Sequence, residues 1–119
     1  MILGIDSSAI TAGCALYDGE KIVAEEFLNA AHTHSQTLLP MIETTLKTAG
    51  KTLADVDRIA VTTGPGSFTG LRIGVSCVKG MCFGTGIPCV GISTPEAIAY
   101  NFVGIDGIIC ACMDARLKQ

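Results

Sequence analysis

A strand-like run, a tight corner and a helical repeat follow one another in residues 58–86, and this succession constrains the fold most. The run "RIAVTTG" is apolar enough for a strand buried on both faces, and "GPG" at 64–66 interrupts it. The segment that follows, 67–86, has apolar residues at helical spacing. A strand that turns directly into a helix predicts one unit of a layered α/β domain.

Elements of both kinds flank this unit. The expected strands are 2–6, 13–17, 21–28, 58–64 and 88–93, and the expected helices are 34–50, 67–86 and 94–102. Thr94 is predicted to cap the last helix, with Pro95 at its first position. The order is β-β-β-α-β-α-β-α, an antiparallel meander that feeds a parallel half. The apolar run 108–113 predicts a sixth strand, and because no helix follows to cover it, we expect a chain cut short.

Composition excludes some classes of function. The net charge is -3 and the eight basic residues are scattered, so we expect no nucleic-acid binding by this chain alone. The six cysteines lack Cys-x-x-Cys spacing, which favours reduced thiols and a cytoplasmic protein over a zinc site or a disulfide framework. No leader or membrane-spanning run is evident, so no membrane association is expected.

Two groups of residues could hold an anion. The first strand ends in a carboxylate and two hydroxyls, and the Gly-Pro-Gly corner leads into a helix N-terminus; the candidate residues are Asp6, Ser7, Ser8, Gly64, Gly66 and Ser67. The alternative is a polar strand end and a corner that only positions the helix. The hairpin after Asp6 lacks a glycine for close approach to phosphate, which favours the alternative. We therefore treat this as a vestigial phosphate site.

No catalytic or metal-binding group is predicted. His32 and His34 are the only histidines, and their spacing does not place them on one helix face as a ligand pair. They are interpreted as polar residues at a helix start, and neither supports a Ser-His-Asp arrangement.

The helix 67–86 has two apolar stripes. One stripe is aliphatic and is typical of a face packed on a sheet; it consists of Leu71, Val75, Val78 and Cys82. The other consists mainly of small residues: Gly70, Ile73, Gly74, Cys77, Met81 and Gly84. Glycine inside a helix costs roughly 1 kcal/mol relative to alanine, so close packing must offset it. That packing could be on the first helix of the same domain or on a helix of another protein, and the two are compatible.

Several motifs together resemble a known family. "ILGIDSS", "HSQTLLPMI", "GPGSFTGLRIGVSCVKG", "PCVGISTPEA" and "MDAR" occur in the order and spacing of the bacterial TsaB (YeaZ) family. Its members are non-catalytic partners of TsaD in making threonylcarbamoyladenosine on tRNA. The resemblance implies an actin-like, Hsp70-like and sugar-kinase-like fold of RNase H-like lobes. It implies a first lobe at 1–104 and the truncated start of a second lobe at 105–119.

The resemblance also implies partners. Family members pair with TsaD, and with themselves when alone, through first-lobe helices. The resemblance therefore assigns the small-residue stripe to the partner interface. The corner at 64–66 is expected to turn this stripe outward. TsaE is a further expected partner. The chain alone would bind no cofactor, ATP or ADP would bind only in the assembled complex, and tRNA would be reached only through that complex.

TsaD carries a His-x-x-x-His metal motif after the strand that corresponds to "PCVGIS", where this chain has Ser93 and Ala97. Neither side chain offers a nitrogen ligand. The alternative function is an actin-like ATPase or a glycoprotease-like enzyme, with Asp6 near magnesium and the 64–67 corner near phosphate.

Overall fold

A computed structural model describes residues 1–29 and 34–114, which contain one five-stranded sheet in the order β3-β2-β1-β4-β5. β1 pairs antiparallel with β2, and β2 with β3, whereas β1 and β5 both run parallel to β4. The strands are β1 Ile2–Asp6, β2 Thr11–Tyr17, β3 Ile22–Asn29, β4 Arg58–Gly64 and β5 Cys89–Ser93. The helices are α1 His34–Thr48, α2 Phe68–Thr85 and α3 Thr94–Ala99, with 3-10 turns at Leu53–Asp55 and Tyr100–Phe102. The predicted α/β class and element order are confirmed.

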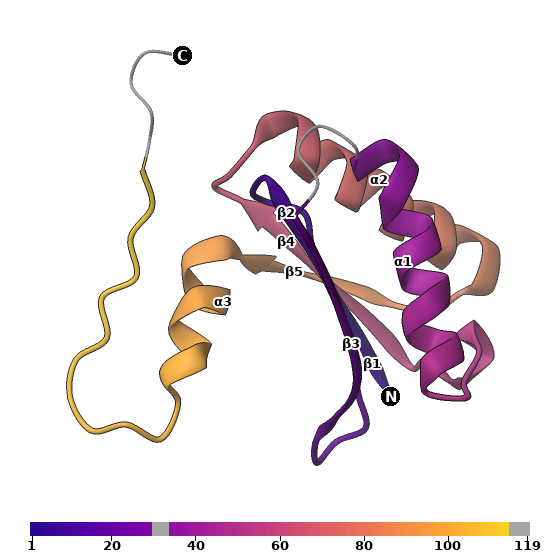
Figure 1. Cartoon of the computed structure of the whole chain (residues 1–119), viewed down its shortest axis with the longest axis horizontal. Helices are drawn as coiled ribbons and strands as arrows, with labels where there is room; N and C mark the ends of the chain where they lie inside the picture. Colours follow the sequence, from indigo (N-terminus) through magenta and orange to yellow (C-terminus); the bar gives the residue numbers. More distant parts are fainter. Residues whose placement is uncertain (30–33, 115–119) are drawn as a thin grey trace.

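Helices cover the two faces of the sheet unequally (Figure 1). α1 and α2 lie together on one face, while α3 lies on the other, against β4 and β5. The core fills the space under α1 and α2, and its most buried apolar side chains are Leu3, Leu16, Leu38, Ile59 and Val78. α1 contributes Leu38, Ile42 and Leu46 at four-residue spacing, which is the periodic apolar face that the sequence predicts. None of the described helices is long and apolar enough to cross a membrane.

The residue that caps α3 differs from the predicted one. Ser93 is its N-cap, and the Ser93 hydroxyl oxygen accepts a hydrogen bond from the backbone N–H of Glu96 at 3.3 Å. The prediction that Thr94 caps this helix was wrong, because Thr94 is already helical and buried. A serine side chain at the end of a strand reaches the first free N–H groups of the helix as well as threonine does.

The predicted sixth strand at 108–113 was also wrong. No strand forms between 103 and 114, and this segment runs as an extended tail away from the sheet (Figure 1). Ile108 is fully exposed. An apolar run becomes a strand only when a neighbouring strand accepts and donates its backbone hydrogen bonds, and none of the described strands lies beside this one. The expected lobe boundary at 104–105 stays a prediction.

Truncation of a core side chain should reveal how far the sheet depends on this single layer of packing. Leu16→Ala removes a side chain with no exposed surface, and we expect the free energy of unfolding to fall by about 2–5 kcal/mol. Ile108→Ala, on the exposed tail, should change it by less than about 0.5 kcal/mol. Urea melts of both variants measure the difference, and equal effects would contradict the placement of the core.

Candidate functional site

A hydrogen-bond network joins the end of β1 to β4. One carboxylate oxygen of Asp6, Oδ1, accepts three hydrogen bonds: from the Ser8 backbone N–H at 3.0 Å, the Ser8 hydroxyl at 2.6 Å and the Thr62 hydroxyl at 2.7 Å. The Ser7 hydroxyl, which is buried, donates to the Gly70 carbonyl oxygen at 2.7 Å. The hydroxyls expected to face an anion therefore bond to the protein itself.

The corner between β4 and α2 packs on the same strand end. The Ser67 backbone N–H donates to the Ser8 carbonyl at 2.7 Å. The Ser67 hydroxyl caps α2 by accepting from the Gly70 N–H at 3.2 Å. A Cβ at Gly66 would lie 2.5 Å from the Ser8 carbonyl oxygen, so only glycine allows this approach. The structure brings the strand end at Ser7 and Ser8 into contact with Gly66 and Ser67, but the Ser7 hydroxyl and the Ser67 N–H donate to carbonyl groups of the protein, and anion binding stays a prediction.

Gly70 and Gly74, two residues of the predicted partner interface, face the interior of the protein. Both are buried, and an added Cβ would overlap the Ser7 carbonyl oxygen at Gly70 and the Ser7 hydroxyl oxygen at Gly74. The prediction that these glycines form an outward surface was therefore wrong. Helical spacing shows which residues share a face, but not which of two apolar faces a distant serine will contact. The glycines allow α2 to approach β1.

The rest of the predicted stripe divides between the core and the surface. Ile73, Cys77 and Met81 are half-buried and pack against the core cluster. Burial raises the pKa of the Cys77 thiol. Gly84 is exposed, and a Cβ there would meet nothing within 4 Å.

The exposed face of α2 carries features that the sequence analysis missed. Phe68 and Phe83 are 74% and 95% exposed. The Arg72 guanidinium lies 5.3 Å from the centroid of the Phe68 ring, within the range of a cation–π contact. Lys79 adds a second positive charge, and α2 contains no acidic residue. The signal in the sequence was two phenylalanines on the polar side of the helix, opposite the glycines.

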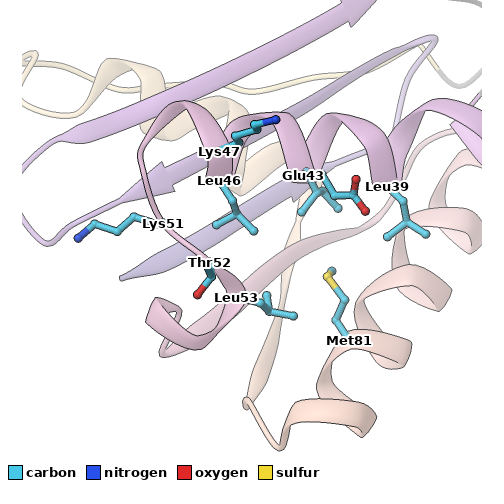
Figure 2. Close-up of a pocket in the computed structure, with 9 residues that line it drawn as sticks. Leu39, Glu43, Leu46, Lys47, Lys51, Thr52, Leu53 and Met81 are labelled. Carbon is cyan, nitrogen blue, oxygen red and sulfur yellow. The ribbon is translucent and has the colours of Figure 1, made fainter.

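An apolar groove of about 410 Å³ lies between α1, the turn after it and α2. In Figure 2 the side chains of Leu46, Leu53 and Met81 point toward a common space, whereas Lys51 points away from it. The lining residues are Leu39, Ile42, Glu43, Leu46, Lys47, Lys51, Thr52, Leu53 and Met81. Leu39 is 53% exposed. Met81 is thus the one member of the predicted interface that lines this groove.

A second hollow, of about 550 Å³, lies on the opposite face of the sheet beside α3. Asp6 and Thr62 are among the residues that line it; the others include Gly4, Gly13, Ala15, Glu25, Glu26, Ala60, Ala97 and Asn101. Among the described residues, no group of three or more His, Cys, Asp or Glu side chains could hold a metal ion. The His34 ring nitrogen Nε2 lies 2.8 Å from the Ala9 carbonyl oxygen, and His32 lies outside the described residues.

Comparison with known proteins identifies the class. The family model described as "TsaD: tRNA N6-adenosine threonylcarbamoyltransferase" matches residues 22–119, and the chain belongs to this family. Within it, the resemblance to TsaB (YeaZ) proteins is confirmed by curated relatives. The chain is 36% identical over 118 residues to the tRNA threonylcarbamoyladenosine biosynthesis protein TsaB of Bacillus subtilis, covering 99% of this chain and 52% of that protein. It is 35% identical over 120 residues to TsaB of Escherichia coli, again covering 99% and 52%.

Solved structures agree with the fold. YeaZ from Pseudomonas aeruginosa superposes with a TM-score of 0.80 at 33% identity, covering 85% of this chain and 47% of that one. A second structure, with the same score and identity, is described as an uncharacterized protein with similarity to peptidase YeaZ from Pseudomonas aeruginosa. The expected TsaD-like, actin-like fold is confirmed. The chain spans about half the length of the curated relatives it matches.

Two glycines of α2 offer a matched test of the contact with β1. Gly74→Ala should lower the free energy of unfolding by about 1–3 kcal/mol, because its methyl group overlaps the Ser7 hydroxyl. Gly80→Ala should raise it by roughly 0.5–1 kcal/mol, because a Cβ there meets nothing and alanine favours helix. Thermal and urea melts compare the two.

The cause can be isolated with a second substitution. Ser7→Ala removes the hydroxyl that a Cβ at Gly74 would overlap, so it should cost less in the Gly74→Ala background than alone. Additive effects would show that the hydroxyl is not the obstacle.

Proposed function

We propose that the chain acts in the biosynthesis of threonylcarbamoyladenosine on tRNA, as a non-catalytic subunit that pairs with a catalytic TsaD-type paralogue. The pathway is supported by the curated relatives, which are named for it and match nearly the whole of this chain. The pairing is supported by the surface that α1 and α2 present.

The observation that carries the proposal is the combination of the apolar groove with the exposed face of α2. Leu39 and Met81 line the groove, and Phe83 lies almost fully exposed on the same helix as Met81. An apolar groove between two helices, with an exposed aliphatic side chain at Leu39, is typical of a site for another helix, and Phe83 adds exposed apolar surface on another side of α2. Arg72 and Lys79, with no acid on α2, favour a partner surface that is apolar at its centre and acidic at its rim.

The chemistry of the strand ends supports a non-catalytic role. The Ser7 and Ser67 side chains both bond to Gly70, and Asp6 Oδ1 already accepts three hydrogen bonds. At the positions of the TsaD metal motif, the Ser93 hydroxyl caps α3 and Ala97 has no donor atom. A metal centre of the TsaD kind would need nitrogen ligands at 93 and 97, and neither residue supplies one.

The remaining partners are part of the same proposal. TsaE joins the assembly, two copies of this chain pair when TsaD is absent, and tRNA is contacted only through the complex. ATP or ADP binds only in that complex.

A nucleotide-binding ATPase is the second candidate, and one observation favours it. Asp6 is one of the residues that line the 550 Å³ hollow, and a carboxylate there is a suitable ligand for a magnesium-bound phosphate. Magnesium-dependent ATP hydrolysis by the purified chain that is lost in Asp6→Asn would favour this candidate over the subunit role. A glycoprotease-like activity would appear as cleavage of a glycoprotein substrate.

A charged substitution in the groove should separate binding from folding. Leu39→Asp should weaken association with the TsaD-type paralogue of the same genome at least tenfold, equivalent to about 1.4 kcal/mol, because it places a carboxylate in an apolar contact. Isothermal calorimetry with the purified paralogue measures the affinity, and sedimentation of the chain alone measures self-association.

Phe27→Asp is the matched control. Phe27 is 69% exposed on β3 and lines the hollow on the opposite face of the sheet, so its replacement should leave association unchanged. If Leu39→Asp bound the paralogue with wild-type affinity and Phe27→Asp bound it more weakly, the interface would lie on the face of the sheet that carries Phe27, not at the groove.

A further inference from the structure

Two of the six cysteines, Cys82 and Cys89, are neighbours where α2 meets the edge of the sheet. Cys82 lies in the last turn of α2, and Cys89 is the first residue of β5. The two thiols lie close enough together that Cys89 raises the pKa of the Cys82 thiol, and both are free thiols. The pair lies outside the groove and the strand-end network described above.

The backbone holds the two thiols together. Gly86 ends α2 in the left-handed conformation, with φ 77°, and its N–H donates to the Cys82 carbonyl at 2.8 Å. The Ile59 N–H then binds the Pro88 carbonyl at 3.1 Å, which fixes the start of β5. Cys89 stands opposite Ile59 in the ladder, and Ile59 is fully buried beneath the helices. Cys89 therefore faces α2, and the turn brings its thiol back to Cys82.

The two thiols differ in access. Cys89 is exposed, whereas Cys82 is half-buried and packs against the core cluster. Burial raises the pKa of the Cys82 thiol, and the neighbouring Cys89 thiol, with its charge when it is a thiolate, raises it further. A reagent from solvent therefore reaches Cys89 first, and Cys82 is placed to react second.

We propose that Cys82 and Cys89 form a reversible disulfide, with a small-molecule disulfide such as glutathione disulfide as the oxidant. The Cys89 thiolate attacks one sulfur of the oxidant, which forms a mixed disulfide and releases one thiolate. Cys82 then loses its proton and attacks the Cys89 sulfur, which releases the second thiolate. Two protein thiols are oxidised, one disulfide is reduced to two thiols, and the two protein protons pass to the released thiolates.

The cross-link would close the turn at 83–88 and tie the last turn of α2 to β5. It depends only on the fold, so it stands apart from the proposed function. The other thiols are the competitors. Cys14 is buried and its pKa is raised to about 11, mainly by burial, whereas Cys110 and Cys112 are exposed on the tail.

The test is oxidation of the whole chain with glutathione disulfide, followed by alkylation of free thiols and mass spectrometry. Cleavage after Lys79, Phe83 and Tyr100 separates the two cysteines into peptides 80–83 and 84–100 and leaves Cys110 and Cys112 elsewhere. We expect these two peptides to be joined, and dithiothreitol to separate them. The cross-linked chain should melt roughly 5 °C or more above the reduced chain, because the closed loop restricts the unfolded state.

Three variants make the result specific. Cys82→Ser should leave glutathione attached to Cys89, Cys89→Ser should abolish the cross-link, and Cys110→Ser should leave it intact. Recovery of Cys82 and Cys89 in alkylated form, while Cys110 and Cys112 oxidise, would overturn the proposal. A melting shift that persists in Cys82→Ser would overturn it equally.

Discussion

The contact between the first turns of α2 and the end of β1 is the interaction on which the rest of this structure depends. Gly66 and Gly70 let the corner and helix reach the Ser7–Ser8 backbone, and the Ser7 hydroxyl bonds to the Gly70 carbonyl. Each helical glycine costs roughly 1 kcal/mol of helix propensity, which close packing and a buried hydrogen bond offset. Glycine is required at Gly66 and Gly70 because the Cβ of any other residue would overlap a backbone carbonyl oxygen of Ser8 or Ser7.

This contact also determines which side of α2 faces solvent. With Gly70 and Gly74 turned toward Ser7, the opposite side of the helix must present Phe68 and Phe83 to solvent. Met81 lies two turns after Gly74 on the same side of α2 and lines the groove beside α1. The exposed surface of α2 is thus a consequence of how the helix is held from within.

Local signals in the sequence were sufficient to predict most of the fold. β4 at 58–64 was predicted to the residue, because its boundaries depend on an apolar run and a glycine that are adjacent in the chain. The orientation of α2 was not predictable in this way, since Gly70 bonds to Ser7, 63 residues earlier. The run at 108–113 has strand-like composition, but composition does not supply a neighbouring strand. The pairing of Cys82 with Cys89 likewise depends on the turn between them.

The same contact bears on whether the strand ends can bind phosphate. A hydroxyl has one hydrogen to donate, and the Ser7 hydroxyl gives it to the Gly70 carbonyl, while the Ser67 N–H gives its own to the Ser8 carbonyl. Phosphate could take these donors only if the helix first moved away from β1, which would also expose the core beneath Val78. For these two donors, holding the helix and binding an anion are alternatives. In this chain those two donors hold the helix, and the proposed role as a subunit needs nothing more from them.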